Sequence, residues 1–175
     1  NIDFVFHMAA NADIKDNLEN PTRCLEQNTL ATSLVLEYMR KANVKNIAFA
    51  STGSVYGEPH IFPTPENYDF PIQTSMYGAS KLSCESLLTA YSYGYGFKTY
   101  IFRFVSLMGE RYSHGCIFDF MKKLSYNSSE LSILGDGKQL KSYLYVKDCV
   151  TAIFKVINSS QEDINIFNLG NYETI

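Results

Sequence analysis

The chain has 175 residues, of which 46% are apolar and 19% charged, so it can form one domain with a sizeable hydrophobic core. Its formal net charge of −3 and its lack of a long basic run argue against partners such as nucleic acid or an anionic lipid surface. No apolar run approaches the roughly 20 residues that a membrane-spanning helix needs, so we expect no membrane segment.

The sequence contains four widely spaced cysteines: Cys24, Cys84, Cys116 and Cys149. They form no Cys-x-x-Cys pair, which argues against a disulfide framework and against a zinc ribbon. We therefore expect reduced, mostly buried thiols and a cytoplasmic protein. The three histidines, His7, His60 and His114, are isolated from one another, so no metal site is predicted. For His7 we expect a hydrogen-bonded structural role.

Predicted strands and helices alternate along the first part of the chain. Residues 2–8 form a short apolar run without strict alternation, which is typical of a parallel strand buried on both faces. Asn20 and Pro21 favour the start of a helix, and apolar residues continue at helical spacing to about Ala42. A second buried strand is predicted at 47–50. This strand, helix, strand unit is a building block of parallel sheets.

A proline-rich segment, residues 57–73, is longer than most connections in compact domains and is a candidate functional loop. The next helix is predicted to begin near Ser75 and to run to the glycines at 94 and 96, with a strand at 99–104 after it. The alternation predicts an α/β fold, a doubly wound Rossmann-like parallel sheet. Ligands of such sheets bind beyond the carboxyl ends of the strands.

Beyond residue 108 the regular alternation of predicted strands and helices ends, and we expect part of a smaller C-terminal substrate lobe to begin there. The expected domains are residues 1–108 and residues 109–175, the second with strands and a helix that can return to the first sheet. The elements predicted in the second part are a helix at 117–124, a short strand at 131–134, a turn at 135–137, strands at 142–146 and 166–169, and a helix at 148–157.

Tyr77 and Lys81 are four residues apart on one predicted helix, so their side chains share a face. A tyrosine beside a fixed ammonium can act as a base if its pKa falls from about 10 towards 7. The same spacing recurs at Tyr143 and Lys147, but these two residues lie on a predicted strand and at the start of the next helix. The Thr52 hydroxyl, at the end of the second strand, can hydrogen-bond a reacting oxygen.

Segments along the whole chain match one known pattern in order. They are His7-Met8-Ala9-Ala10, Asn28, Ser51-Thr52-Gly53-Ser54-Val55-Tyr56-Gly57, Tyr77-Gly78-Ala79-Ser80-Lys81, Arg103-Phe104-Val105-Ser106-Leu107-Met108-Gly109, Gly135-Asp136-Gly137-Lys138-Gln139, Tyr145-Val146-Lys147-Asp148 and Phe167-Asn168-Leu169-Gly170. Together they resemble the extended short-chain dehydrogenase/reductases, specifically the nucleotide-sugar epimerases and dehydratases, and among these the UDP-glucose 4-epimerases. The resemblance implies an NAD cofactor, a UDP-hexose substrate, and a homodimer formed through helices at 21–42 and 76–95.

The resemblance also implies roles for single residues at the cofactor. Asn28 would help to order the segment that passes along the NAD, and Lys81 would hydrogen-bond the nicotinamide ribose. The implied cofactor-binding residues are Met8, Ala9, Ala10, Asn28, Thr52, Tyr77, Lys81 and Val105.

In the same family, Thr52, Tyr77 and Lys81 would be the catalytic residues, with Lys81 lowering the Tyr77 pKa. Thr52, Tyr77, Ser106 and Lys141 would face the nucleotide sugar. Ser106 stands where many members carry an Asn, and Lys141 where many carry an Arg. These two departures affect the expected substrate contacts, because Lys cannot reproduce the bidentate fork of Arg.

Gly53 and Ser54 stand where the 4,6-dehydratases of this family carry an Asp and a Glu that eliminate water. Without that acid and base, epimerisation at C4 is favoured: Tyr77 takes the hydroxyl proton, NAD takes a hydride, and the hydride returns to the other face of the 4-keto sugar. A 4,6-dehydratase or decarboxylase of the same family is an alternative. A non-catalytic dinucleotide-binding scaffold is an alternative from another class.

The glycine fingerprint that binds pyrophosphate after a first strand does not occur in this sequence. We therefore expect an internal fragment of a longer protein, without the first strands of the Rossmann sheet. Residues 1–108 would be the C-terminal part of an NAD-binding domain, and residues 109–175 the start of the substrate lobe.

Overall fold

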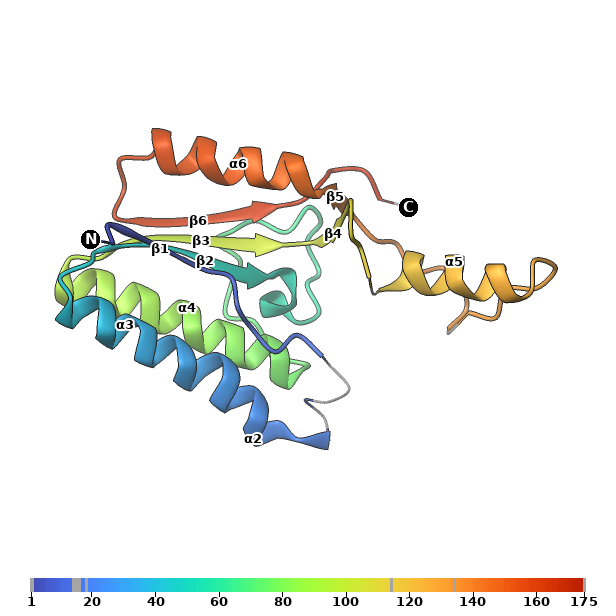
Figure 1. Ribbon diagram of the computed structural model, residues 1–175, viewed down its shortest axis with the longest axis horizontal. Coiled ribbons are helices and arrows are strands. Elements are labelled where there is room, and N and C mark those ends of the chain that lie inside the picture. Colours follow the sequence, from blue (N-terminus) through green and yellow to red (C-terminus); the bar gives the residue numbers. More distant parts are fainter. Residues whose placement is uncertain (1, 14–16, 18, 114, 134, 175) are drawn as a thin grey trace.

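The computed structural model describes residues 2–13, 17, 19–113, 115–133 and 135–174. Four strands form one sheet in the order β1 (Phe4–His7), β2 (Asn46–Thr52), β3 (Lys98–Phe104), β6 (Ile164–Leu169). Each neighbouring pair is parallel, so the carboxyl ends of the strands lie at one edge, towards the right in Figure 1. The predicted parallel sheet is confirmed.

Helices cover both faces of this sheet. On one face, α2 (Pro21–Cys24), the π-helical segment η1 (Leu25–Leu30) and α3 (Ala31–Lys41) follow one another without a break, beside α4 (Met76–Tyr95). The other face is covered by α6 (Val146–Ser159), which together with β6 comes from the second part of the chain (Figure 1). The doubly wound Rossmann-like architecture is therefore confirmed. No helix in the described ranges is long and apolar enough to span a bilayer.

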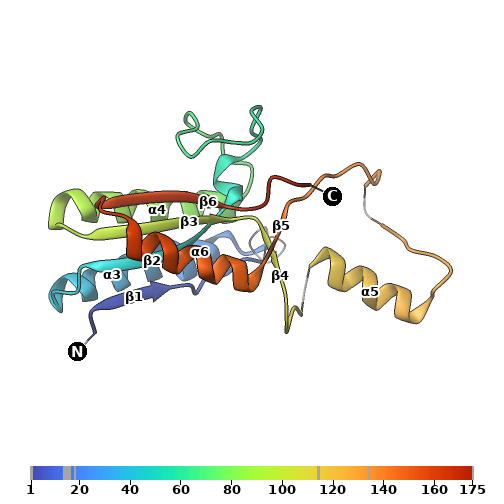
Figure 2. The ribbon, with the colours of Figure 1, turned by 90° about the horizontal axis from the view of Figure 1, so that it is seen from above.

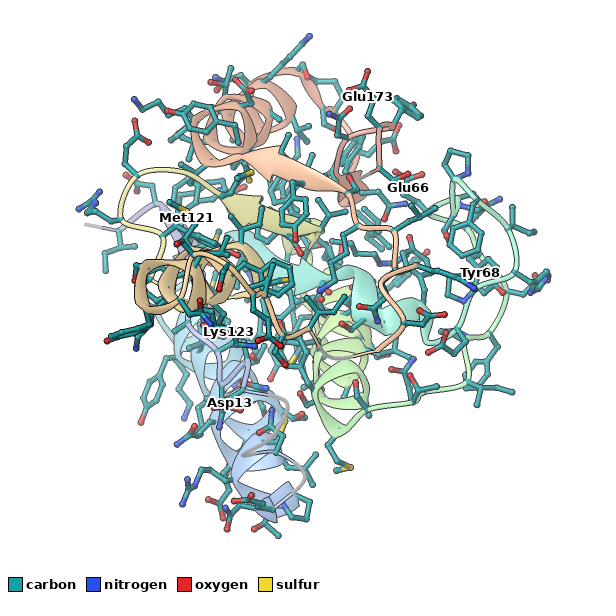
Figure 3. The ribbon with its side chains drawn as sticks, turned by 90° about the vertical axis from the view of Figure 1, so that its right-hand side faces the viewer. Asp13, Glu66, Tyr68, Met121, Lys123 and Glu173 are labelled. Carbon is teal, nitrogen blue, oxygen red and sulfur yellow. The ribbon has the colours of Figure 1, made fainter. Side chains whose placement is uncertain are left out.

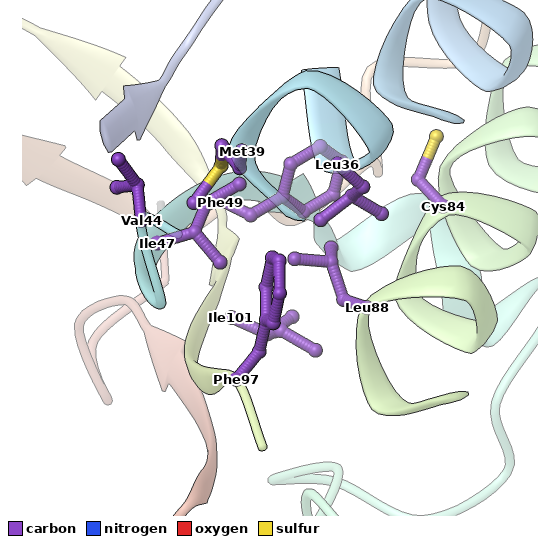
Figure 4. Packing of buried hydrophobic residues seen from close by; sticks show 9 residues of the cluster. All are labelled: Leu36, Met39, Val44, Ile47, Phe49, Cys84, Leu88, Phe97 and Ile101. Atoms are coloured by element: carbon purple, nitrogen blue, oxygen red, sulfur yellow. The ribbon is translucent and has the colours of Figure 1, made fainter. Parts of the chain in front are cut away.

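Two hydrophobic clusters fill the space between the sheet and its helices. The cluster under α3 and α4 contains Leu36, Met39, Val44, Ile47, Phe49, Cys84, Leu88, Phe97 and Ile101 (Figure 4). The cluster under α6 contains Ala48, Tyr100, Phe102, Cys149 and Ile153. Successive strand residues face opposite sides, so Ile47 and Phe49 enter the first cluster and Ala48 the second. Both faces are buried, which explains why these strands lack polar alternation.

The helix that carries two candidate residues, α4, has clear signals at both ends. The Ser75 Oγ accepts a hydrogen bond from the Gly78 N–H at 3.0 Å, and Gly96 ends the helix with φ 66°. Glycine adopts this left-handed conformation without a steric penalty. Both predicted ends are confirmed. At α2, Pro21 occupies the first turn as predicted, but the Asn20 side chain makes no capping hydrogen bond.

After β3 the chain leaves the main sheet. The strands β4 (Ser106–Met108) and β5 (Tyr143–Tyr145) pair in parallel, and α5 (Cys116–Tyr126) stands apart from the main sheet in Figures 1 and 2. The predictions of a helix at 117–124, a strand near 142–146, a helix near 148–157 and a strand near 166–169 are confirmed.

The strand predicted at 131–134 is wrong for residues 131–133, because in the described part of the chain no strand pairs with them. The Ser132 carbonyl instead accepts a hydrogen bond from the Lys123 ammonium at 2.7 Å. Gly135 and Gly137 have φ of 91° and 75°, in agreement with the predicted turn. Leu134 and His114 lie outside the described residues.

The long segment 57–73, all of it described, contains no helix or strand but is tied to the carboxyl edge of the sheet. Arg103 Nη1 donates to the Glu66 carbonyl at 3.0 Å, and Asn168 Nδ2 donates to the Thr64 carbonyl at 2.8 Å. Figure 3 looks towards this edge and labels Glu66 on the segment. The segment is thus held beside the region where the fold predicts a ligand.

Candidate active site

The three predicted catalytic residues meet at the carboxyl edge of the sheet. Thr52 ends β2, and Tyr77 and Lys81 lie in the first turns of α4. Thr52 is close enough to Tyr77 for its side chain to lower the pKa of the phenol. Thr52 Oγ1 also accepts a hydrogen bond from the Ser54 N–H at 3.1 Å, which holds the Thr52 side chain in place.

Burial raises the pKa of Tyr77 above its ordinary value, because desolvation disfavours the phenolate, and the hydrogen bond with Thr52 offsets part of this effect. The lowering of the pKa that we expected from Lys81 is not found. The Lys81 ammonium instead lies over the ring of Phe49, with Nζ 4.0 Å from the ring centroid. The chain's own groups therefore favour the neutral phenol.

Lys81 is an unusual buried cation. Only 2% of the residue is exposed to solvent. Burial lowers the pKa of Lys81 to about 8, although Cys84 and Glu85 act in the opposite direction. Burying most of a cationic side chain is costly, and such a group is a candidate for binding a polar ligand.

The predicted cofactor residues Met8, Ala9 and Ala10 follow β1 at the same edge and are exposed. Asn28 is buried in η1 and binds the segment just beyond them. Its Oδ1 accepts a hydrogen bond from the Asn11 N–H at 2.8 Å, and its Nδ2 donates to the Asn11 carbonyl at 3.0 Å. Asn28 therefore orders the backbone that follows β1.

A cavity of about 370 Å³ opens beside Thr52. It lies between the ends of β2 and β3 and the residues just before β5, and its volume is in the range of small-molecule sites. The lining residues are Thr52, Gly53, Ser54, Phe104, Val105, Ser106, Leu140, Lys141 and Ser142. The cavity thus brings four predicted site residues together from distant parts of the sequence: Thr52, Val105, Ser106 and Lys141.

Sequence reasoning missed a buried ion pair between Glu85 of α4 and Arg103 of β3. The Ser51 hydroxyl donates to Glu85 Oε1, and Arg103 Nη1 donates to the Tyr56 hydroxyl at 2.7 Å. One signal was present in the sequence: Glu85 lies four residues after Lys81 and therefore on the same side of the helix.

Two further predictions concern residues outside the site. His7 is confirmed as a hydrogen-bonded residue, with Nε2 2.9 Å from Thr32 Oγ1. Tyr143 and Lys147 lie on β5 and α6, and Lys147 pairs with Glu110 at 2.7 Å, so the second Tyr-x-x-x-Lys spacing is not on one helix. Within the described ranges, no three His, Cys, Asp or Glu residues form a group that could hold a metal ion.

A doubly wound parallel sheet with a threonine, a tyrosine and a lysine at its carboxyl edge defines a Rossmann-like α/β protein. Residues 1–170 match the NAD dependent epimerase/dehydratase family, and the chain belongs to that family. The resemblance seen in the sequence is confirmed.

Three relatives illustrate the match. A protein of Methanocaldococcus jannaschii named putative UDP-glucose 4-epimerase is 37% identical over 171 residues, which cover 94% of this chain and 55% of that protein. The crystal structure of UDP-glucose 4-epimerase from Thermotoga maritima with UDP-glucose has a TM-score of 0.86 and 31% identity, and the match covers 99% of this chain and 57% of that one. The crystal structure of a UDP-glucuronic acid 4-epimerase mutant from Bacillus cereus, in complex with a fluorinated UDP-sugar and NAD, has a TM-score of 0.88 and 26% identity. That match covers 100% of this chain and 56% of the other. The chain spans about half the length of these relatives.

Proposed function

We propose that the chain is the catalytic part of an NAD-dependent nucleotide-sugar 4-epimerase that acts on UDP-hexoses. The observation that carries this proposal is the position of Thr52, which is close to Tyr77 and lines a cavity together with Gly53 and Ser54. The complexes of relatives with UDP-sugars and NAD support the choice of substrate and cofactor.

The residues present fit a bound dinucleotide. The Lys81 side chain is largely buried, and its ammonium can donate hydrogen bonds to the hydroxyl groups of a ribose. Met8, Ala9 and Ala10 are exposed at the carboxyl edge of the sheet, where they can contact a cofactor. Val105 lines the cavity and can contact the cofactor from there. NAD, when bound, accepts the C4 hydride of the sugar and returns it to the opposite face.

The chain's own residues would move the proton. Tyr77 Oη takes the proton of the C4 hydroxyl and later returns it, so it must pass through the phenolate form. Burial opposes this form by raising the pKa of Tyr77, so the hydrogen bond from Thr52 is needed to stabilise it. Lys81, whose pKa is about 8, is mostly protonated at neutral pH and adds a positive charge to the same helix.

Substrate binding is proposed for the cavity wall opposite Thr52. Lys141 is exposed and cationic and lines the cavity together with Ser106 and Ser142. The ammonium suits the diphosphate of a nucleotide sugar, and the serine hydroxyls can bind its sugar or nucleotide hydroxyls.

A 4,6-dehydratase or decarboxylase is less well supported. Elimination of water needs a proton donor and a base at the sugar. None of the residues that line the cavity in the described part of the chain carries a carboxyl group. A non-catalytic scaffold would have no need of Thr52, Tyr77 and Lys81 in one place.

We also propose a cytoplasmic homodimer. The four cysteines all lie among the described residues and are free thiols, as expected in a reducing compartment. Leu30, Leu34 and Tyr38 are spaced four residues apart on one helix side and are 54%, 50% and 70% exposed. A second copy of the protein would cover this stripe. Light scattering of the full-length protein at micromolar concentration tests this, and a monomer would refute it.

The decisive experiment incubates the full-length protein with NAD and UDP-glucose. We expect UDP-galactose as the product, whereas a 4-keto-6-deoxy sugar would establish a dehydratase. NAD binding without any turnover would favour the non-catalytic dinucleotide-binding scaffold. Tyr77→Phe and Thr52→Ala should abolish turnover with the fold intact. Tyr143→Phe, the tyrosine of the second Tyr-x-x-x-Lys spacing, is the matched control and should remain active.

A further inference from the structure

We propose that Ser80 is a positioning residue that couples the backbone after β1 to the Tyr77 and Lys81 turn of α4, through the side chain of Asn28. The coupling rests on the proposed function, because it concerns how the cofactor segment is held relative to the tyrosine and the lysine. It assigns a role to a residue between the two predicted catalytic residues that does not itself touch substrate or cofactor.

Ser80 is completely buried and has hydrogen bonds on both sides. Its hydroxyl donates to the Tyr77 carbonyl at 2.8 Å, within the same helix. The same oxygen accepts a hydrogen bond from Asn28 Nδ2 at 2.9 Å, and from the Cys24 thiol at 3.3 Å. A hydroxyl has one proton to donate, so the bond to Tyr77 fixes its direction and leaves its lone pairs for Asn28 and Cys24.

Asn28 continues the connection to the segment after β1. One Nδ2 proton binds Ser80, and the other binds the Asn11 carbonyl at 3.0 Å. The Asn28 Oδ1 accepts from the Asn11 N–H at 2.8 Å. A rotation of the Asn28 amide would break these bonds at the same time. The path from the Tyr77 carbonyl to Asn11 therefore has one favourable arrangement, and a buried network of this kind is rigid when all its members are satisfied.

The helix that carries Asn28 is locally wider than an α-helix. Asn28 lies inside η1, the π-helical segment Leu25–Leu30, and π-helical turns are frequent at functional sites. Two more bonds join this segment to α4: Thr29 Oγ1 donates to the Ser80 carbonyl at 3.3 Å, and the Cys84 thiol donates to the Asn28 carbonyl at 3.5 Å. Ser80 and Asn28 are thus held at the contact between the two helices, and their side-chain bond is the direct link.

The coupling predicts a specific effect of Ser80→Ala. Asn28 Nδ2 loses the Ser80 hydroxyl as an acceptor and keeps the Asn11 carbonyl and the Cys24 sulfur, 3.5 Å away. The orientation of the amide is then less fixed, and its hold on Asn11 weakens. We expect the dissociation constant for NAD to rise about tenfold, which corresponds to the loss of about 1.4 kcal/mol. At saturating NAD, kcat should change by less than about threefold, because Tyr77 and Lys81 keep their own helix contacts. If Ser80 had a merely structural role, Ser80→Ala would lower thermal stability without weakening NAD binding more than it lowers kcat.

The experiment compares variants of the full-length protein by NAD titration, kcat at saturating NAD, and hydrogen exchange at the Asn11 amide. Ser83→Ala is the matched control, since the exposed Ser83 hydroxyl donates to the Ala79 carbonyl at 2.9 Å on the same helix. We expect weaker NAD binding and faster Asn11 exchange in Ser80→Ala, and neither change in Ser83→Ala. Ser80→Cys replaces the hydroxyl by a larger and more weakly hydrogen-bonding thiol, and it should show changes in the same direction if the alanine variant does not fold.

A double variant separates coupling from independent effects. If Ser80 acts through Asn28, Ser80→Ala should weaken NAD binding no further in an Asn28→Ala background. Fully additive losses, or unchanged NAD affinity and Asn11 exchange in Ser80→Ala, would overturn the coupling while the wild type still binds NAD. Failure of the wild type to bind NAD would overturn the proposed function as well.

Discussion

Arg103 holds the carboxylate of Glu85 inside the protein, with Nη2 2.7 Å from Oε2 and Nε 3.1 Å from Oε1. The two side chains are 9% and 5% exposed. Glu85 also accepts a hydrogen bond from Ser51, and Arg103 also donates to Tyr56 and to the Glu66 carbonyl. Because every partner is supplied from a different element, this ion pair connects the strand ends, α4 and the long loop behind the candidate site.

Replacing one member of this ion pair should lower the free energy of unfolding much more than replacing both. Arg103→Met leaves the Glu85 carboxylate buried without its cation, and we expect a loss of about 3–5 kcal/mol in the free energy of unfolding. The double variant Arg103→Met, Glu85→Met buries no charge and should recover most of that loss. Urea unfolding of the full-length protein measures both. Additive losses in the double variant would show that the pair is not coupled.

The buried Lys81 predicts a conflict between stability and activity. Its pKa is about 8 in the folded protein, against an ordinary value of 10.5, so between these values the unfolded chain binds more protons. The stability of the wild type should therefore rise from pH 8 to 10.5, with the full cost of burying the charge present below pH 8.

Lys81→Met removes this cost. We expect the variant to lose turnover but to be more stable at pH 7 by about 3 kcal/mol, at about 1.4 kcal/mol per unit of pKa shift. The advantage over the wild type should shrink as the pH approaches 10.5. Thermal or urea unfolding of both proteins at pH 7, 9 and 10 tests the prediction. A variant less stable than the wild type at pH 7 would contradict it.

The sequence predicted most elements because their signals are local. Short apolar runs marked β1 and β2, and Ser75 and Gly96 marked the ends of α4. The strand at 131–134 failed because a strand needs a partner, and an apolar run does not reveal whether one is present. Thr52 lies at the same edge of the sheet as the residues after β1 because β1 and β2 are parallel neighbours.

The sequence predicted which residues form the candidate site more completely than it predicted their pKa shifts and their hydrogen-bond and ion-pair partners. Burial decides the direction of the Tyr77 pKa, and burial depends on packing from several elements. The contact of Glu85 with Arg103 joins residues on two elements, and the bonds of Asn28 to Asn11 and Ser80 join three. Such contacts have no fixed spacing in the sequence, so a motif that names the residues cannot give their partners.

Two glycines should respond in opposite ways to alanine. Gly57 has φ 63°, and a Cβ there would lie 2.0 Å from the Ile72 carbonyl oxygen, so Gly57→Ala must move the backbone of the long loop. We expect it to destabilise the protein by several kcal/mol, on the order of 3. Gly94 lies in α4, and apart from its chain neighbours and its own helix backbone no atom is within 4 Å of an added Cβ, so Gly94→Ala should stabilise by about 1 kcal/mol. Unfolding midpoints in urea compare the two, and equal shifts would contradict the argument.

Lys141 should determine how tightly the nucleotide sugar binds. Its side chain lines the cavity, and the proposed diphosphate contact is charge-assisted, so Lys141→Ala should raise KM for UDP-glucose about tenfold with a smaller effect on kcat. Lys141→Arg should bind at least as tightly as the wild type, because a guanidinium can hold two phosphate oxygens at once. Lys138→Ala is the matched control: Lys138 is exposed in the same segment, pairs with Asp136 at 3.9 Å, and does not line the cavity. Steady-state kinetics of the full-length protein distinguish the variants. If Lys138→Ala raised KM as much as Lys141→Ala, the effect would come from the overall positive charge of the segment and not from a contact in the cavity.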